Sequence, residues 1–175
     1  MLYALVAVIV VQRLLELRVA ARNLRWAVSN GGREYAPEHY PPMVAMHSIW
    51  IAALLLEGTL RDGAPSSLWW LWLGLFVAAQ VGRYSVITTL GRYWNTRIVI
   101  VPGGKRIQRG LYKYLSHPNY VVVALEIAVA PLIFDAWITA LVFTLLNAAL
   151  LLLVRIPAEE RALELYRSDT ARLET

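Results

Sequence analysis

The first group of residues suited to chemistry is GLYKYLSHPNY, residues 110–120, where a polar loop meets an apolar segment. Pro118 has no amide hydrogen and disfavours helical geometry at His117, so we expect a helix to begin at Pro118 with His117 at its edge. A helix start favours a bound carboxylate, while Tyr112 and Tyr120 offer flat faces to a heterocycle. A simple helix cap with tyrosines anchored among lipid headgroups accounts for the same residues equally well.

The second group is RIPAEE, residues 155–160. If a helix continues across Pro157, the spacing of Arg155 and Glu159 puts a guanidinium and a carboxylate on one helix face. These two groups could hold a ligand or simply bind each other. The structural alternative is an arginine reaching the membrane surface from a helix end, followed by acidic residues in the first turn of a new helix.

Several other kinds of site are not expected. The chain lacks the glycine pattern of dinucleotide-binding folds, and the glycine pair before Lys105 lacks the remaining residues of a phosphate loop. It has no cysteine, which excludes thiolate metal sites and cysteine nucleophiles. Its histidines are His39, His47 and His117, and the spacing of the first two does not give adjacent ligands on one helix face. We therefore predict no metal site, and no motif supports a haem held by His47 and His117.

The elements that must position these residues follow from composition. The chain has 175 residues, of which 58% are hydrophobic and 17% charged, too few charges to cover the surface of a soluble domain. We predict a single membrane domain, residues 1–175. The net charge of +5 does not indicate nucleic-acid binding, because the basic residues lie between apolar segments, as in membrane proteins.

The predicted fold is an all-α integral membrane bundle of about five transmembrane helices. The candidate spans are residues 2–19, 43–60, 67–90, 120–134 and 136–155. The last two form a helical hairpin, and a cytoplasmic amphipathic helix is expected beyond Pro157. The first span is the weakest, because its second half carries Arg13 and Glu16 and is expected to emerge as an amphipathic extension among the headgroups.

Basic residues predict the orientation of the bundle. Of the 17 Lys and Arg residues, all but Arg61 fall in segments that five spans place on one side. Positive charge collects on the cytoplasmic side, so we expect an exterior N terminus and a cytoplasmic C terminus. Within the hairpin, Glu126 and Asn147 are polar residues at membrane depth. We expect a protonated Glu126 bonded to Asn147, with a polar cavity lined by Glu126 as the alternative.

Taken together, these features resemble the isoprenylcysteine carboxyl methyltransferase family. The matching parts are Gly110-Leu111-Tyr112, His117-Pro118-Asn119-Tyr120, the hairpin, and Arg155 followed by Glu159-Glu160. Ser116 and Val122 stand where the family usually has Arg and Gly, and the end of the chain is shorter than in eukaryotic members. The chain is more similar to short bacterial members, some of which are associated with O-methylation of alkylpyrones or alkylresorcinols.

The resemblance implies a membrane enzyme that transfers a methyl group from S-adenosyl-L-methionine to a carboxyl, phenolic or enolic oxygen of a lipophilic acceptor. It implies that Arg155 acts on the acceptor, and that the cofactor region spans residues 94–166. The implied cofactor contacts are Tyr112, His117, Pro118, Asn119, Tyr120 and Glu159, with a loop contribution from Gly104, Lys105, Arg106 and Ile107.

The same resemblance implies that membrane lipids and the acceptor are the partners, and that the site faces the cytoplasm at a bacterial inner membrane. The oligomeric state stays open. Two alternatives also stay open: a phospholipid N-methyltransferase, and a non-catalytic membrane scaffold whose basic loop binds anionic headgroups.

Overall fold

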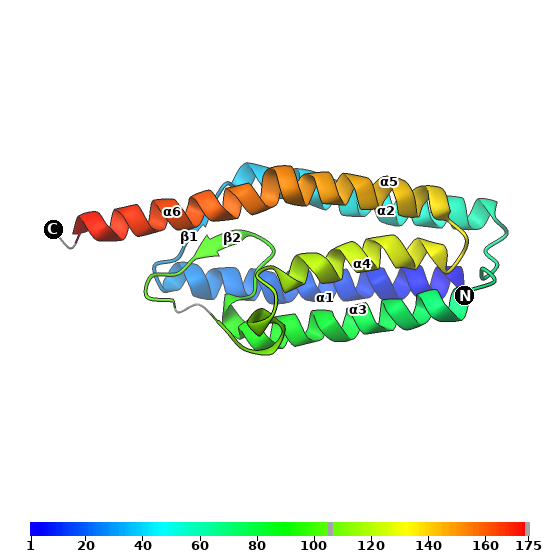
Figure 1. The fold of residues 1–175 in the computed structure, drawn as a ribbon, viewed down its shortest axis with the longest axis horizontal. Helices are drawn as coiled ribbons and strands as arrows, with labels where there is room; N and C mark the ends of the chain where they lie inside the picture. Colours follow the sequence, from blue (N-terminus) through cyan, green and yellow to red (C-terminus); the bar gives the residue numbers. More distant parts are fainter. Residues whose placement is uncertain (105–106, 174–175) are drawn as a thin grey trace.

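Long helices run side by side along one axis of the molecule (Figure 1). The computed structural model describes residues 1–104 and 107–173, and for residues 167–173 the backbone alone. Helices account for 77% of the structure, which confirms the predicted all-α membrane bundle. The helices are α1 Leu2–Ser29, α2 Tyr40–Leu60, α3 Trp69–Leu90, α4 Pro118–Leu132, α5 Trp137–Ala149 and α6 Ile156–Leu173.

Three helical stretches of the described residues are long and apolar enough to cross a membrane: Pro37–Leu60, Trp69–Tyr93 and Trp137–Tyr166. Helix α4 is a shorter apolar helix. Leu56, Leu152 and Leu153 remain exposed on the outside of the bundle, as expected for side chains that face lipid. The protein is therefore a membrane protein in which apolar surface points outward as well as inward.

The first helix differs from its predicted form. Residues 2–19 were expected to span, with an amphipathic second half among the headgroups, but α1 is one uninterrupted helix as far as Ser29. Its polar residues at Arg13 and Glu16 turn toward the other helices rather than toward headgroups, and Glu16 is only 8% exposed. Opposite charges on neighbouring helices provide the reason, because a paired charge inside the bundle avoids contact with lipid.

Close packing joins α3 to α4. A Cβ atom on Gly82 would lie 3.0 Å from the Cγ2 atom of Val122, so the absence of a side chain at Gly82 allows the two helices to approach. On the other side of the bundle, the carboxylate of Glu57 accepts hydrogen bonds from the backbone amides of Ile138 and Thr139. This caps the first turn of α5, whose amides have no partner within the helix.

A small sheet that the sequence analysis did not predict lies at one end of the bundle. Strands β1 Arg33–Tyr35 and β2 Ile98–Ile100 pair antiparallel. Ile98 packs with Ala158 and Ala162, so α6 rests on the strand pair. Two loops far apart in the sequence are thereby joined to each other and to the last helix.

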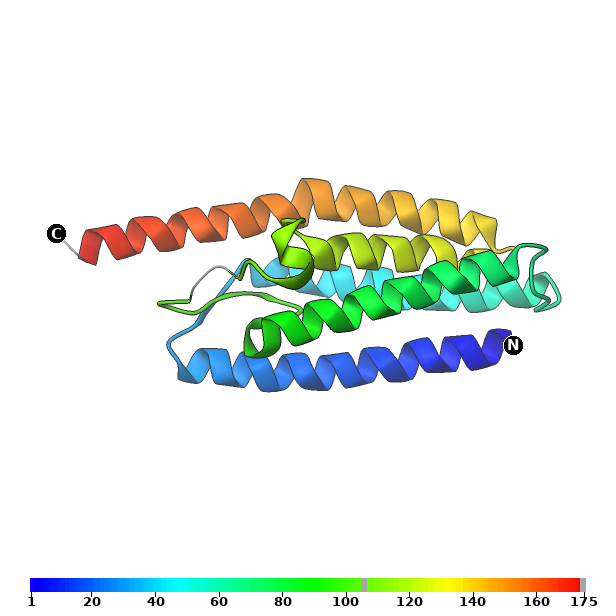
Figure 2. The same ribbon diagram turned by 60° about the horizontal axis from the view of Figure 1, so that its bottom comes forward.

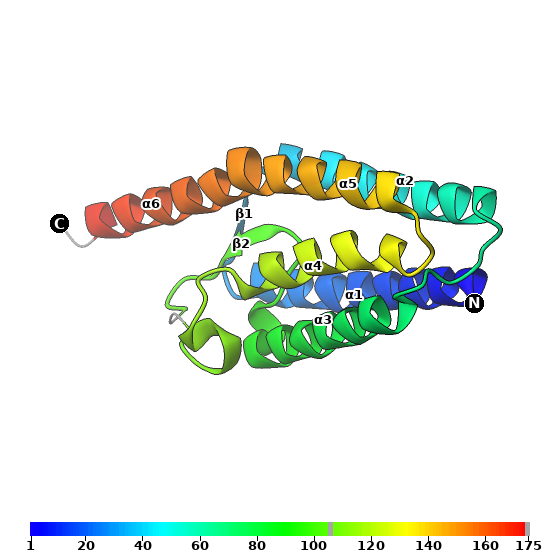
Figure 3. The same cartoon turned by 45° about the vertical axis from the view of Figure 1, so that its right-hand side comes forward.

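The two ends of the bundle carry different structural elements (Figure 3). The N terminus and the connections at residues 61–68 and 133–136 lie at one end, and the strand pair and α6 lie at the other. Most of the basic loop residues lie at the second end, in the loops around β1 and β2 and before α4. Arg13 and Arg83 do not belong to that set, because they lie inside helices α1 and α3 and form buried ion pairs.

Candidate functional site

A cavity of about 370 Å³ lies between the helices and β2. Its size is within the range of small-molecule binding sites. Six of the residues predicted to bind the cofactor or the acceptor line it: Tyr112, His117, Asn119, Tyr120, Arg155 and Glu159. Residues from both sequence groups, 110–120 and 155–160, therefore meet in one cavity.

The first wall is the start of α4. The helix begins at Pro118 with His117 as its N-cap, as the missing amide hydrogen of proline predicts. The His117 and Tyr120 rings are stacked, with centroids 5.2 Å apart and planes inclined by 7°. This stacking fixes the orientation of both rings at the cavity wall.

The second wall is the junction of α5 and α6, where the helix does continue across Pro157 (Figure 2). A π-helical segment, Leu150–Arg155, connects the two helices and ends on Arg155. Proline removes an amide donor from a helix, and a π turn directly before it lets the chain accommodate that loss with a bend. Such π segments occur frequently at functional sites.

Hydrogen bonds join the two walls. The hydroxyl of Tyr120 donates to Oε2 of Glu159 at 2.5 Å and accepts from Nε of Arg155 at 3.3 Å. Nδ1 of His117 lies 3.8 Å from the same Glu159 oxygen. Among the contacts between described residues, Arg155 and Glu159 form no direct ion pair, because the Tyr120 hydroxyl stands between them.

Arg155 is held from a third direction. Its Nη2 atom donates to the backbone oxygen of Thr96 at 3.0 Å, in the segment that leads into β2. Its exposed fraction is 6%, so it does not reach into the headgroup region as the snorkelling alternative requires. The guanidinium is a fixed positive charge at the cavity wall.

Tyr112 belongs to the 3-10 turn Gly110–Lys113. Burial, together with the nearby carboxylate of Glu159, raises the pKa of Tyr112 to about 12. The side chain is therefore a neutral phenol at physiological pH. It offers the cavity a hydrogen-bond donor and an aromatic face.

The remaining sequence-predicted residues lie elsewhere. Pro118 is buried at the helix start and is not one of the cavity-lining residues. Gly104 and Ile107 do not line the cavity either. Lys105 and Arg106 lie outside the described residues. The predicted loop contribution thus has no counterpart in the cavity walls formed by the described part of the chain.

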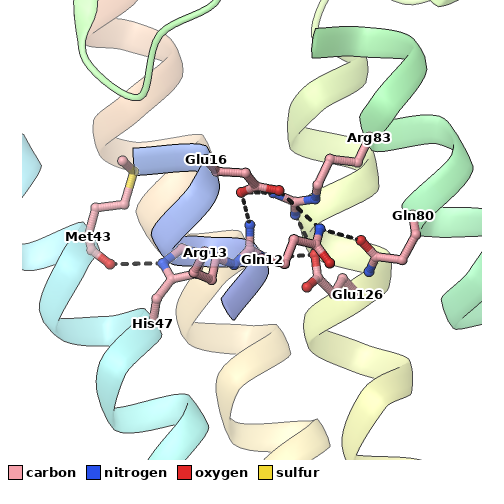
Figure 4. A network of polar contacts seen from close by, with 8 residues as sticks. All are labelled: Gln12, Arg13, Glu16, Met43, His47, Gln80, Arg83 and Glu126. Carbon is pink, nitrogen blue, oxygen red and sulfur yellow. Dashed lines mark hydrogen bonds and ion pairs between the residues drawn. The ribbon is translucent and has the colours of Figure 1, made fainter. Parts of the chain in front are cut away.

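Sequence reasoning missed a network of buried charges (Figure 4). Arg83 binds the carboxylates of Glu16 and Glu126 and is 2% exposed. Arg13 Nη2 lies 2.7 Å from Glu126 Oε2, and Arg13 Nη1 lies 2.7 Å from Glu16 Oε2. Two positive and two negative side chains from α1, α3 and α4 therefore neutralise one another.

The expected bond between Glu126 and Asn147 is wrong, because the carboxylate is bound by two arginines instead. Nδ2 of Asn147 is buried and has no partner among the described residues. The alternative, a cavity lined by Glu126, is not observed either, although Asn147 does line the cavity. Ionisable residues of opposite sign in three apolar spans were the signal that could have predicted the network.

Comparison with known proteins supplies the family. The isoprenylcysteine carboxyl methyltransferase (ICMT) family matches residues 72–165. The uncharacterized protein YpbQ of Bacillus subtilis is 41% identical over 167 residues, covering 95% of this chain and 98% of that protein. An uncharacterized protein of Haemophilus influenzae is 27% identical over 158 residues, covering 90% and 91%. No solved structure gives a significant match.

The matched region contains both walls of the cavity described above, from Tyr112 to Glu159. It covers more than half of the chain. The protein belongs to the isoprenylcysteine carboxyl methyltransferase family of membrane methyltransferase-like proteins.

Proposed function

We propose that the protein is an S-adenosyl-L-methionine-dependent methyltransferase that methylates an oxygen of a lipophilic acceptor. The acceptor oxygen is a carboxyl, phenolic or enolic one, and a polyketide-derived lipid is a suitable example. The observation that carries the proposal is the Tyr120 hydroxyl, which bonds both Glu159 and Arg155 at the wall of one cavity. This arrangement places an acidic group, a basic group and aromatic faces around a space of small-molecule size.

The residues present fit the cofactor. Asn119 and Trp94 line the cavity, and their Oδ1 and Nε1 atoms are buried without a partner among the described residues. An unpaired oxygen suits an exocyclic amine, and an unpaired N–H suits a carboxylate or a ring nitrogen. Glu159 can bind an ammonium group or ribose hydroxyls, and the stacked His117 and Tyr120 rings suit a purine. Buried polar groups normally have partners, so the two orphaned atoms support a polar ligand here.

When bound, the cofactor would supply an electrophilic methyl group on a sulfonium sulfur. The residues of this chain would do the rest by positioning. Glu159 would hold the donor side, while Arg155, fixed by Thr96 and Tyr120, would hold the acceptor oxygen. Placing two reactants in line can lower a barrier by about 7–11 kcal/mol. The buried walls would exclude water, and no side chain needs to form a covalent bond with substrate.

We further propose that the acceptor enters from the lipid between helices, and that the cofactor enters from the cytoplasm at a bacterial inner membrane. The cavity lies at the end of the bundle that carries most basic loop residues, which supports a cytoplasmic site. Exposed leucines on α2 and on the π-helical segment, including Leu56 and Leu153, support contact with lipid hydrocarbon.

Calorimetry on detergent-purified protein, titrated with S-adenosyl-L-methionine and with S-adenosyl-L-homocysteine, tests the proposal. We expect binding by the wild type and at least about tenfold weaker binding by His117→Ala and Glu159→Ala, since each loses a polar or stacked contact. Glu160→Ala is the matched control, because Glu160 is exposed next to Glu159 and does not line the cavity.

A folded wild type that binds neither compound contradicts the proposal and favours a membrane scaffold. Methyl transfer to a phospholipid amine, with none to oxygen acceptors, would favour phospholipid N-methylation instead.

A further inference from the structure

A second hollow lies at the end of the bundle that carries the strand pair, between α1 and the 3-10 turn Gly91–Tyr93 that follows α3. The residues that line this arginine hollow are Arg22, Asn23, Trp26 and Arg92. None of them lines the cavity described above. In the described part of the chain, no acidic side chain lines the hollow. It is therefore a separate, positively charged site that neither the methyl donor nor the acceptor occupies.

The buried side chain of Asn23 joins the two sides of the arginine hollow. Its Nδ2 atom donates to the backbone oxygens of Gly91 at 3.1 Å and of Trp94 at 2.7 Å, on either side of Arg92 in the sequence. Its exposed fraction is 3%, so water does not compete strongly for these hydrogen bonds. The backbone that carries Arg92 is thereby fixed beside the backbone that carries Arg22.

The two arginines of the hollow are exposed, and neither has an ion-pair partner among the described residues. Arg92 lies over the ring of Trp26, with its Cζ atom 5.9 Å from the ring centroid. Two positive charges in one hollow repel each other, and an anion between them removes that repulsion. Guanidinium groups bind phosphate through pairs of parallel hydrogen bonds. The hollow thus has the chemistry of a phosphate site.

The surface of α1 changes from apolar to basic just before the hollow. Exposed large hydrophobic side chains continue along α1 as far as Leu17, and within residues 18–27, all of them described, no further one is exposed. The exposed side chains there include Arg18, Arg22 and Arg25. Such a change is typical of the boundary between lipid hydrocarbon and headgroups. It indicates that the hollow lies at the level of the lipid phosphates.

The neighbouring helix indicates the same level. The apolar helical stretch Trp69–Tyr93 ends directly after Arg92. Trp26, in the wall of the hollow, is a residue type enriched at membrane interfaces. A soluble phosphate needs no hydrocarbon beside its site, whereas a phospholipid would lay its acyl chains along the apolar part of α1. These features favour a lipid over a free ion.

We propose that the arginine hollow binds the phosphate of an anionic phospholipid. Arg22 and Arg92 contact the phosphate oxygens, and the acyl chains lie along the exposed hydrophobic side chains of α1 that end at Leu17. A zwitterionic lipid carries its own ammonium group beside the phosphate, so it compensates the two arginines less well. The lipid bridges α1 and the segment after α3, in which Tyr93 and Trp94 line the main cavity.

The first test measures lipid binding to the purified protein by native mass spectrometry in detergent. Phosphatidylglycerol and phosphatidylcholine with identical acyl chains are the probes, and we expect the former to bind wild type about tenfold more tightly or better. In the double variant Arg22→Gln with Arg92→Gln, affinity for phosphatidylglycerol should fall by about tenfold or more.

The matched control is the double variant Arg25→Gln with Arg33→Gln. Both arginines are exposed and lie outside the hollow, and the change removes the same net charge. Its affinity for phosphatidylglycerol should stay within about twofold of wild type, because salt screens exposed charges that do not touch the lipid.

Three results would overturn the proposal. Equal weakening in the two double variants would show attraction by the general positive charge of this end. Equal affinity of wild type for the two lipids would show that the hollow does not select an anion. Displacement of phosphatidylglycerol by inorganic phosphate at the same concentration would assign the hollow to a soluble ion. If the Arg22 and Arg92 double variant does not fold, Arg92→Gln alone, compared with Arg33→Gln alone, decides.

The second test locates the hollow relative to the bilayer. The chain has no cysteine, so a single introduced cysteine can carry a fluorophore. In vesicles of phosphatidylcholine and phosphatidylglycerol, label on exposed Ala21→Cys, beside Arg22, should be quenched more by a nitroxide on the lipid headgroup than by one deep in the acyl chain. Label on Leu14→Cys, about 10 Å away along α1, should show the reverse order.

Stronger quenching of the Ala21→Cys label by the acyl-chain nitroxide, or quenching by neither lipid, would place the hollow away from the phosphates and overturn the proposal. Neither test involves methyl transfer, so both outcomes are independent of the proposed enzymatic function.

Discussion

The hydroxyl of Tyr120 lies 2.5 Å from Oε2 of Glu159, which joins the first turn of α4 to the first turn of α6. The same hydroxyl accepts a hydrogen bond from Arg155. One side chain therefore sets the separation between an acidic and a basic group on the wall of the cavity. The consequences of removing it, and of altering the residues around it, can be measured.

Removing the Tyr120 hydroxyl should loosen both of its partners. In Tyr120→Phe we expect S-adenosyl-L-homocysteine to bind about threefold to tenfold more weakly, because a lost hydrogen bond costs about 0.5–1.5 kcal/mol. Calorimetry measures the change. Tyr114→Phe is the control, since Tyr114 is 77% exposed and should give wild-type affinity. Equal affinity for Tyr120→Phe and wild type would show that this hydroxyl does not organise the site.

Arg155 should matter for turnover more than for cofactor affinity. In Arg155→Ala we expect kcat to fall by about 100-fold to 1,000-fold, the usual effect of removing one group that stabilises charge at a reacting oxygen. Affinity for S-adenosyl-L-homocysteine should change little. Methyl transfer and calorimetry on the same preparation separate the two, with exposed Arg161→Ala as control. Unchanged turnover would remove Arg155 from the acceptor side.

The buried charges of Figure 4 should be strongly coupled in stability. In Arg83→Met we expect a loss of about 3–5 kcal/mol, because Glu16 and Glu126 would then share only Arg13 and one negative charge inside the bundle would lack compensation. The double variant Arg83→Met with Glu126→Met restores neutrality and should regain at least half of that loss. Chemical unfolding in micelles measures all three proteins.

The partly exposed pair of Arg61 with Glu57 gives the matched control. Arg61→Met should cost less than about 1 kcal/mol. Additive losses in the double variant of Arg83 and Glu126 would show that their charges are not coupled.

Two glycines of α3 provide a test of helix packing. In Gly82→Leu we expect a destabilisation of about 1–3 kcal/mol, because the new side chain would collide with Val122 on α4. In Gly74→Leu nothing lies within 4 Å of the new Cβ atom, and leucine favours a helix over glycine, so stability should hold or rise. Thermal unfolding of both variants measures the difference. Equal melting temperatures would contradict the close approach of α3 and α4.

Tyr112 should make the stability of the folded protein fall as pH rises in the alkaline range. Its pKa is raised from 10.0 to about 12 by burial and by Glu159, so the folded protein keeps this proton where the unfolded chain loses it. The stability that the neutral Tyr112 side chain contributes is fully present below pH 10 and is lost as pH rises toward about 12. Tyr112→Phe should lack this part of the alkaline loss, whereas exposed Tyr114→Phe should retain it. Unfolding midpoints across this range provide the measurement.

Local rules were enough to predict the two polar groups and most of the helices, although not the continuation of α1 as far as Ser29. Pro118 marks the start of α4 because of a property of proline itself, and three apolar helical stretches of the described residues have the length that a bilayer requires. The meeting of Tyr120, Arg155 and Glu159 could be expected only from their joint resemblance to a family pattern. None of the residues between Tyr120 and Arg155 specifies how close these side chains come to one another.

What the sequence did not reveal depends on contacts between distant segments. The pairing of Glu34 with Val99 joins two loops through backbone groups that any sequence possesses. The partners of Glu126 come from α1 and α3, and a local interpretation assigned Arg83 to a basic loop and Glu126 to Asn147. Opposite charges in separate spans indicate that pairing is favourable, but the choice of partners requires the three-dimensional arrangement.

Part of the cavity wall comes from outside the region that the family has in common. Met43 and His47 of α2, and Arg13 of α1, line the cavity, whereas the family matches residues 72–165. Relatives with the same signature residues could therefore act on different lipids by changing their first two helices alone. Exchanging those helices between family members would offer a direct route to new acceptor selectivity without altering the residues that we propose to surround the methyl donor.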